Sequence, residues 1–355
     1  MSFERRSKKL FVIAAVILLS VASVRKHYER PHVCPRRIGS LDGPGPGKEW
    51  HIGGWAIRRL CSQPLDTLFF VHTAPAHWER RIHHRDTVFE DAAREAFNWT
   101  GVFFMGEHED PLVNLWTKLE AEATGDVVIF PYNDTFHTIL YKLVFGMRWV
   151  TEHCPNVRNI VKIDDEVGVQ PFELRRYLDE KLPLKNTSIH GLVWKGSKVV
   201  RDPRDKYCVP EDEVILDNYP PYCSGRSIIM TMDTMEKLYR ASKIVKAYAI
   251  DDTYLSGDLA LFTNTGHEDI ASWISWNSSD VNTERLLQGK AIFTHELLAY
   301  ENSLGRRAQW GQMIWSQMMQ HRSRRAFNFS YRLDDRAYRN DFREIRRALA
   351  TARVT

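Results

Sequence analysis

Short apolar runs alternate with helical patterns through the middle of this 355-residue chain. Four runs rich in aromatic and β-branched residues have the length of buried strands, at residues 67–71, 101–105, 126–130 and 159–163. Each run is separated from the next by a segment long enough for a helix. Because strands that alternate with helices form a mainly parallel sheet covered by helices, the pattern predicts an α/β fold.

The clearest helical period follows the third run. Apolar residues recur at helical spacing through residues 136–150, and Asp134 or Thr135 can cap the start of this helix. Farther along, the pattern predicts a strand at residues 225–231 and a helix at residues 233–244. The α/β alternation therefore extends beyond the first four runs.

The amino-terminal region differs in kind from the rest. An uncharged apolar run at residues 10–24 follows four basic side chains, which is the pattern of a signal anchor. A cleaved signal peptide is the alternative, because residues 21–23 are small enough for a signal peptidase. Both interpretations place the rest of the chain in the lumen. Glycine and proline at residues 37–50 indicate a stem.

Composition agrees with a lumenal location. N-x-[ST] sequons occur at Asn98, Asn133, Asn186, Asn277 and Asn328. Five cysteines allow two disulfides and one free thiol, and none has the spacing of a zinc site. Basic side chains are concentrated in residues 1–37 and 306–355, so the body between them is acidic. An acidic body argues against a nucleic-acid-binding protein.

Three consecutive carboxylates, Asp164, Asp165 and Glu166, follow the fourth apolar run. Ligands of open α/β sheets gather at the carboxyl ends of strands, and clustered carboxylates bind hard divalent cations such as Mg²⁺ or Mn²⁺. The alternative is a solvated turn, since a second acidic triple at residues 211–213 lies in a segment typical of an exposed loop.

Motifs in the same order as in a known family occur between about residues 65 and 262. They are ERRIHHRDTV (79–88), FFMG (103–106), GDVVIF to CPN (125–156), KIDDEV (162–167), PRDKYCVPEDEV (203–214), YPPYCSG (219–225) and IDDTYLSG (250–257). Together they resemble the β1,3-hexosyltransferase family, which contains β1,3-galactosyltransferases and β1,3-N-acetylglucosaminyltransferases.

The chain departs from the family pattern at four places. Val88 stands where the family usually has Trp, and Glu166 replaces the third Asp of the acidic motif. Arg226 occupies a position where a small residue is usual. The segment 251–257 has Asp for the usual Glu and one extra residue before its Gly. These departures put the strength of metal binding, the acceptor pocket and the register of the last motif in question.

The resemblance implies a GT-A type, Rossmann-like nucleotide-sugar-binding fold behind an N-terminal membrane anchor. The segments are then a cytosolic tail (1–9), the anchor (10–24), a lumenal stem (25–60), the GT-A catalytic domain (61–300) and a basic C-terminal extension expected to be helical (301–355). Such a protein is a single-pass type II protein of the Golgi membrane, and a homodimer is a further possibility.

The same resemblance implies an inverting, metal-dependent transfer from a UDP-sugar to a hydroxyl of a glycan on a glycoprotein or glycolipid, forming a β1,3 bond. UDP-galactose is the favoured donor, with UDP-GlcNAc and UDP-GalNAc as alternatives. A catalytically inactive member that acts as a lectin-like or chaperone protein is the main rival, since the acidic motif and the last motif are altered. A lumenal hydrolase is a third class, but the chain lacks a Ser/His/Asp constellation.

Residue roles follow from the resemblance. Asp164 and Asp165 would contact the nucleotide sugar and metal, with Glu166 the main ligand of Mn²⁺ or Mg²⁺ and Asp164 a second ligand. His295 would complete the metal shell, or be structural. Asp252 would be the general base, because an inverting transfer needs one carboxylate to take the acceptor proton.

Other residues carry two interpretations each. Asp251 would raise the pKa of the neighbouring base at the substrate site, or cap a helix. Arg81 and Arg85 would reach the nucleotide, or pair with Asp86 or Glu90, and Lys142 would contact phosphate, or be solvated. Tyr222 and Gly225 would line a sugar pocket, or form a turn. By the same resemblance, Cys154 and Cys223 flank motifs that meet, so we expect a disulfide between them.

Overall fold

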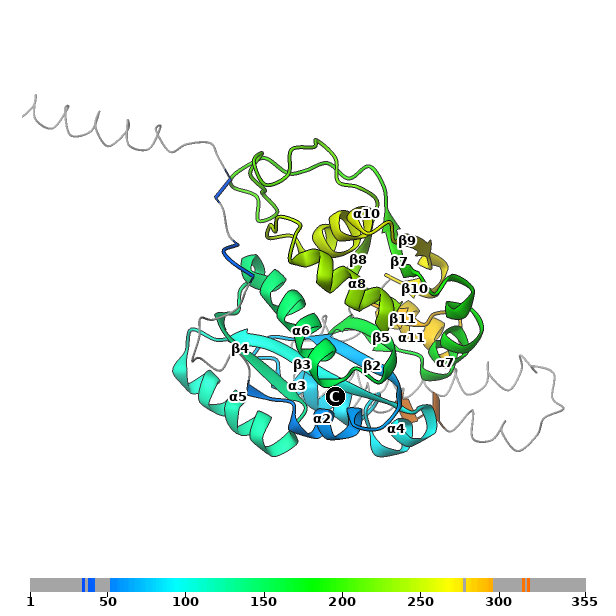
Figure 1. The fold of residues 1–355 in the computed structure, drawn as a ribbon. Coiled ribbons are helices and arrows are strands. Elements are labelled where there is room, and N and C mark those ends of the chain that lie inside the picture. The colour runs from blue at the N-terminus through cyan, green and yellow to red at the C-terminus, as the bar shows by residue number, and fades with distance from the viewer. Residues whose placement is uncertain are drawn as a thin grey trace, which may run out of the picture.

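The computed structural model describes residues 34–35, 38–41, 52–276, 279–295, 315–316 and 318–319 (Figure 1). The predicted tail and anchor, residues 1–24, lie outside the described residues, as does most of the C-terminal extension. Within the described ranges, no helix combines the length and apolar character that crossing a membrane requires.

An eight-stranded mixed sheet forms the centre of the molecule. Its strands are β1 (Ile52–Gly53), β2 (Leu65–His72), β3 (Trp99–Glu107), β4 (Val127–Asn133), β5 (Val157–Asp164), β7 (Ser188–Trp194), β8 (Tyr222–Thr231) and β9 (Gly266–Asp269). They pair in the order β1-β4-β3-β2-β5-β8-β7-β9. Strands β2, β3, β4 and β5 are parallel, whereas β8 is antiparallel to both β5 and β7.

A second, three-stranded sheet lies in the order β10-β11-β6. Its strands are β10 (Ile274–Ser275), β11 (Phe293–Thr294) and β6 (Gly168–Val169). The described helices are α2 (Trp55–Cys61), α3 (Trp78–Arg85), α4 (Asp91–Phe97), α5 (Pro111–Thr124), α6 (Ile139–His153), α7 (Pro171–Glu180), α8 (Met232–Ser242), α9 (Asp251–Thr253), α10 (Ala260–Phe262) and α11 (Ser279–Leu287).

The predicted elements are confirmed, with bounds that move by a few residues. The four apolar runs lie in β2, β3, β4 and β5, and the later run lies in β8. The predicted helix at 136–150 is a 3₁₀ turn, Phe136–Thr138, followed by α6. Thr135 caps this turn together with Thr138, because each side chain bonds the backbone of the other.

The two faces of the sheet have separate cores. Phe70 packs with α6 and α8 on one face, whereas its neighbour Phe69 packs with α4, α7 and α11 on the other. Successive side chains of a strand point to opposite faces, so a strand covered on both sides has a continuous apolar run, as residues 68–71 of β2 have. Each fully buried aromatic side chain contributes about 1.5–3 kcal/mol to the free energy of unfolding.

Residues at both ends of the chain join this folded unit. The described fold begins at β1 and α2, where Ile57 and Cys61 are buried, although the stem is expected to extend to residue 60. Trp315 and Met318, from the predicted extension, are buried in the core that contains Phe69. The indole Nε1 of Trp315 donates to Glu90 Oε1 at 2.5 Å.

The disulfide pairing differs from the expectation. Cys34 is bonded to Cys208 and Cys61 to Cys154, whereas Cys223 is buried and belongs to no disulfide. The expected Cys154–Cys223 pair is therefore wrong. Cys154 ends α6 at the edge where β5 begins, while Cys223 lies within β8 and packs against Gly191 of β7. The two motifs are neighbours in the fold, but these thiols lie at different ends of the strands.

Three sequons can be placed. The side chains of Asn98, Asn133 and Asn186 are exposed. Asn277 and Asn328 lie outside the described residues. The described sequons are thus accessible to modification.

Candidate active site

The strand order reverses between β2 and β5. From β2 the chain adds β3 and then β4 on one side, and it returns to place β5 on the other side. Ligands of open α/β sheets bind outside the carboxyl ends of the strands at such a switch point. His72 and Asp164, the last residues of these two strands, are register partners. The predicted acidic triple therefore lies where an α/β sheet binds its ligand.

Lys162 provides a buried positive charge beneath this edge. Its Nζ donates to Asp164 Oδ1 at 2.7 Å and also to the backbone oxygen of Gly225 on β8. Burial alone would lower the pKa of Lys162, but three carboxylates around it raise that pKa above its ordinary value. The lysine is therefore charged, and it links β5 to β8.

Asp165 is a structural hub rather than an open ligand. One carboxylate oxygen accepts hydrogen bonds from Thr73 at 2.7 Å and His77 at 2.8 Å, and the other accepts one from Arg80 at 2.6 Å. Burial alone would raise the pKa of Asp165, but these donors outweigh it and hold the pKa well below its usual range. The carboxylate is therefore ionised and joins the end of β5 to α3.

Glu166 lies between two arginines. Its Oε2 is 3.2 Å from Arg80 Nη1, and its Oε1 is 3.9 Å from Arg226 Nε. The guanidinium of Arg226 in turn lies over the ring of Trp276, 5.5 Å from the centroid. Burial and the charge of Asp164 raise the pKa of Glu166. Arg226, the departure noted in the sequence, therefore faces the altered residue of the acidic motif.

His295 lies at the same side of the sheet. Its Nε2 is 2.9 Å from the hydroxyl of Ser227, which pairs with Ile163 on β5. Its ring packs against Trp276, with centroids 4.2 Å apart. The predicted metal residues are thus neighbouring, but in the part of the chain that the structure describes no three His, Cys, Asp or Glu side chains are arranged to share one ion.

The carboxylates face cations from the protein itself. Asp164 is paired with Lys162, and Glu166 with Arg80 and Arg226. A divalent ion at Glu166 would have to compete with these arginines, because each of its two carboxylate oxygens faces a guanidinium. As arranged, these residues therefore do not fit a bound ion.

The second acidic group, Asp251 and Asp252, begins the short helix α9 beside β8. Asp251 is buried, and its Oδ2 lies 3.9 Å from Nδ1 of His72. Asp252 is more open. Burial first, and then the charge of Asp251, raise the pKa of Asp252 to about 7. A carboxylate with this pKa accepts a proton near neutral pH, which is the property of a general base.

Gly225 makes room for this carboxylate. A Cβ at residue 225 would lie 1.8 Å from Asp252 Oδ1, so no other residue fits without moving Asp252. Gly225 lies within β8, so the alternative of a tight turn into a strand can apply only to the residues before Tyr222. Tyr222 begins the same strand and is half-buried, and the charge of Asp252 contributes to its raised pKa after burial. Both residues therefore adjoin the candidate base.

Arg81 and Arg85 are engaged within the protein. The fully buried Arg81 donates to both oxygens of Glu120, at 2.8 and 2.6 Å. Arg85 donates to Glu120 at 2.8 Å and to both oxygens of Asp126, at 2.8 and 2.7 Å. The arginines are thus paired with acids, as one of the two interpretations predicted, and these acids lie on α5 and just before β4. Their role toward a nucleotide stays a prediction.

Lys142 is buried, so the alternative of a solvated lysine is wrong. Its Nζ donates to the backbone oxygen of Thr73 at 2.6 Å and lies 3.0 Å from Asp134 Oδ2. The carboxyl end of β2 covers it. Contact with a phosphate stays a prediction.

Three further residues were not expected from the sequence. Arg80 and Lys162 balance the acidic triple, and His72 lies between the two acidic groups. Burial, and then the charges of Lys162 and Lys142, lower the pKa of His72, so its imidazole is neutral. The signal for Lys162 was available, since a lysine within an apolar strand needs a buried partner. Nothing local distinguished Arg80 from its neighbours.

Fold and site together define a doubly wound α/β protein with carboxylates and cations at its switch point. The galactosyltransferase family model matches residues 79–270, more than half of the chain. The chain therefore belongs to the galactosyltransferase family.

Relatives in this family are distant. The chain is 25% identical over 197 residues to β-1,3-galactosyltransferase 1 of Mus musculus, covering 55% of this chain and 60% of that protein. It is 30% identical over 210 residues to the acetylgalactosaminyl-O-glycosyl-glycoprotein β-1,3-N-acetylglucosaminyltransferase of Mus musculus, covering 57% and 53%. It is 31% identical over 208 residues to lactosylceramide 1,3-N-acetyl-β-D-glucosaminyltransferase B of Xenopus laevis, covering 56% and 55%.

The match thus spans a little over half the length of these relatives. Among solved structures, a glycosyltransferase involved in the glycosylation of the major capsid of PBCV-1 aligns with 70% of this chain and all of its own. That alignment has a TM-score of 0.36 and 12% identity.

Proposed function

We propose that this protein is an inverting β1,3-hexosyltransferase of GT-A type that transfers a sugar from a UDP-sugar to a hydroxyl of a glycan. Family membership supports transfer of a hexose, and the names of the relatives support β1,3 linkage to a glycoprotein or glycolipid acceptor. UDP-galactose is the donor we favour, ahead of UDP-GlcNAc and UDP-GalNAc.

The observation that carries the proposal is Asp252. Its carboxylate lies against Gly225 at the edge of the sheet, and its pKa of about 7 suits proton transfer near neutral pH. In the neighbouring acidic triple, by contrast, hydrogen-bond donors hold the pKa of Asp165 well below its usual range, so this carboxylate is a fixed charge beside the base.

The proposed reaction is a single displacement. Asp252 takes the proton of the acceptor hydroxyl while that oxygen bonds to the anomeric carbon. The bond from that carbon to the diphosphate oxygen breaks on the opposite face, and its electron pair leaves with UDP. Arg80 and Arg226, both partly exposed at this edge, are the cations placed to face the departing charge. Lys162 holds β5 and β8 in register beneath them.

Dependence on Mn²⁺ or Mg²⁺ is implied by the resemblance, and the ion pairs of Glu166 argue that an ion must compete with arginine there. An assay with added Mn²⁺ or with EDTA therefore tests metal dependence separately from sugar transfer. Loss of turnover in EDTA means that Glu166 exchanges Arg80 for the ion, and full turnover means that the arginines supply the charge.

We further propose a Golgi lumenal location with type II topology. Two disulfides and three exposed sequons support an oxidising, glycosylating compartment. Removal of N-glycans by a glycosidase should increase the gel mobility of the protein made in cells. A homodimer stays a prediction, which size-exclusion chromatography with light scattering measures directly.

The deciding experiment is UDP release by the full-length protein with UDP-Gal, UDP-GlcNAc, UDP-GalNAc or UDP-Glc and a panel of methyl β-glycosides as acceptors. We expect release with one donor that depends on an acceptor. The stereochemistry and position of the new bond follow from NMR of the product. No acceptor-dependent release with any donor, from protein that is folded by circular dichroism, would sink the proposal.

A further inference from the structure

The long loop between β7 and β8, residues 195–221, carries an open aromatic ring. Tyr207 is 43% exposed and packs edge-on against Phe136, which is 39% exposed, with ring centroids 5.2 Å apart and planes at 86°. Nζ of Lys206 lies 4.8 Å from the centre of each ring. Two partly exposed aromatic rings beside a charged side chain offer a ligand both an apolar face and a polar donor.

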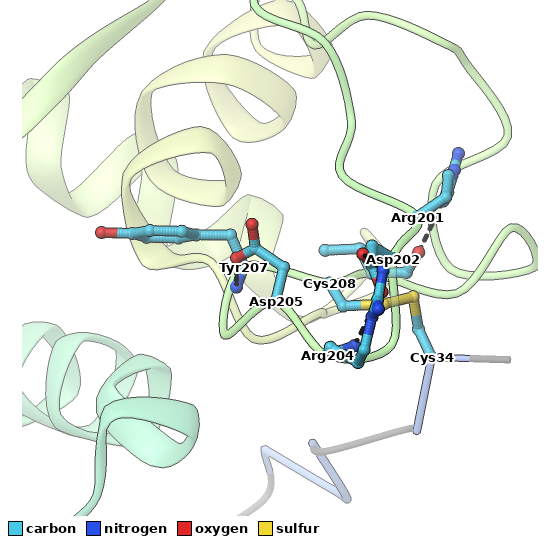
Figure 2. Close-up of a disulfide and its surroundings, with 8 residues drawn as sticks. Cys34, Arg201, Asp202, Arg204, Asp205, Tyr207 and Cys208 are labelled. Carbon is cyan, nitrogen blue, oxygen red and sulfur yellow. Dashed lines mark hydrogen bonds and ion pairs between the residues drawn. A yellow bond between two sulfur atoms is a disulfide. The ribbon is translucent and has the colours of Figure 1, made fainter. Parts of the chain in front are cut away.

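The loop fixes the position of Tyr207. The next residue, Cys208, is bonded to Cys34, and the amide of Tyr207 donates to Asp205 Oδ1 at 2.8 Å. Figure 2 shows the ring of Tyr207 extending away from the disulfide, while Arg201 points to the other side. Through its guanidinium, Arg201 donates to backbone oxygens across the loop, at Val209 (2.7 Å), Val214 (2.5 Å) and Leu216 (3.2 Å). The ring is thus held in place before any ligand arrives.

The aromatic pair connects to the candidate base through Tyr222. The loop ends at Tyr222, the first residue of β8, whose strand also contains Gly225. Burial first, and then the Asp252 carboxylate and the nearby Tyr207 phenol, raise the pKa of Tyr222. Tyr222 therefore lies near enough to both the candidate base and Tyr207 to feel each of them electrostatically.

We propose that Phe136 and Tyr207 form an acceptor subsite, which binds a pyranose ring of the glycan next to the sugar whose hydroxyl faces Asp252. A pyranose has an apolar face of C–H groups and a rim of hydroxyls. The open aromatic faces match the first, and the ammonium of Lys206 can donate to the second. This inference rests on the proposed function, since it names the acceptor part of the same site.

The test compares acceptor and donor kinetics in the full-length protein. The variants are Tyr207→Ala, Phe136→Ala and Tyr207→Phe, which keeps the ring. Ile215→Ala is the matched control, because Ile215 is an apolar residue of the same loop that is 87% exposed. The acceptors are methyl β-lactoside, with two pyranose rings, and methyl β-galactoside, with one. Methyl aglycones are used because an aryl group would itself stack on the aromatic residues.

We expect Tyr207→Ala and Phe136→Ala to raise the KM for the disaccharide about tenfold, as loss of a stacking contact does, with the donor KM unchanged. Tyr207→Phe and Ile215→Ala should behave as wild type, and the monosaccharide KM should change least. An unchanged disaccharide KM in both alanine variants, or an equal rise in the donor KM, overturns the subsite.

Binding without turnover separates this inference from the proposed function. Saturation-transfer NMR detects weak glycoside binding to the wild-type protein and the variants in the absence of donor. A disaccharide signal lost in Tyr207→Ala but kept in Ile215→Ala supports the subsite even if no transfer occurs. Absence of any glycoside signal in the folded wild type overturns it. Thermal melting of each variant identifies a folding defect. If Tyr207→Ala has one, comparison of Tyr207→Phe with the wild type shows the effect of losing the hydroxyl while the ring is kept.

Discussion

Two groups of adjacent carboxylates meet at one edge of the sheet, and their surroundings shift the pKa of one member of each group in opposite directions. Asp165, in the group after β5, is buried among donors that lower its pKa. Asp252, in the group that begins α9, is packed beside another carboxylate, and its pKa is raised to about 7. The same side chain is thus a permanent charge in one group and a proton acceptor in the other.

The difference lies in what each carboxylate faces. Asp165 accepts hydrogen bonds from three side chains, two of them on or next to α3. Asp252 faces the Gly225 backbone and its neighbour Asp251, with Lys162 as the opposing charge. Environments that separate the pKa values of nearby acids also separate their roles. The predictions below test this division, from the largest expected effect to the smallest.

Asp252→Asn should abolish most of the turnover. The amide keeps the shape of the side chain but cannot accept the proton, so kcat should fall by about 10²–10⁴-fold, while the donor KM changes little. UDP release in the presence of acceptor measures this. Asp233→Asn, an exposed residue of α8, is the control and should retain full activity. Equal turnover in Asp252→Asn and wild type would remove the proposed base.

Asp165→Asn should instead act on stability. The substitution removes the buried charge that pairs with Arg80 and should lower the free energy of unfolding by roughly 3 kcal/mol. This value is at the lower end of the range for breaking a buried ion pair, because Arg80 still pairs with Glu166. Urea unfolding measures the loss as a lower midpoint with an unchanged slope. Asp164→Asn, at a more open position, should cost less. The reverse order would mean that Asp165 is not the hub of this group.

Gly225→Ala should misplace the base without removing it. The new Cβ forces the Asp252 carboxylate away, and a displacement of about 1 Å can lower kcat by roughly 10²-fold. The same assay measures it, and the donor KM is the internal control. Activity at the wild-type level would show that Asp252 occupies a different position during turnover.

The pH profile should show the raised pKa directly. A base acts only when ionised, so kcat/KM should rise with pH up to about 7 and level off above it. One pH unit below that value the rate should be roughly tenfold lower. Measurement of kcat/KM from pH 5 to pH 9 at constant ionic strength tests this. A profile that is flat from pH 5 to pH 8 would contradict the assignment of Asp252.

Much of the fold followed from local pattern. The four apolar runs became β2 to β5 because strands buried on both faces have nearly continuous apolar runs. The position of Asp164 at the site also followed, since it ends one of these strands and the switch point fixes where ligands bind. These inferences needed only residues close together in the sequence.

Long-range pairings were not available from the sequence. Arg80 meets Asp165 across 85 positions, and no period of the chain marks it. Lys142 falls on the polar side of its helix by spacing, yet the end of β2 covers it. Cys154 and Cys223 belong to motifs that do meet, but the direction of α6 places the first thiol beside Cys61 instead. Such contacts depend on how elements pack, which short motifs do not encode.

The burial of Trp315 means that part of the core is supplied by a segment that is synthesised late. The core that contains Phe69 includes Trp315 and Met318, which leave the ribosome after all the strands of the sheet. A nascent chain therefore carries an incomplete core with exposed aromatic residues until this late segment arrives, and such a state favours aggregation. Completion of this face of the molecule has to wait for residues 315 and 318, and a chaperone that shields apolar surface would act during that interval.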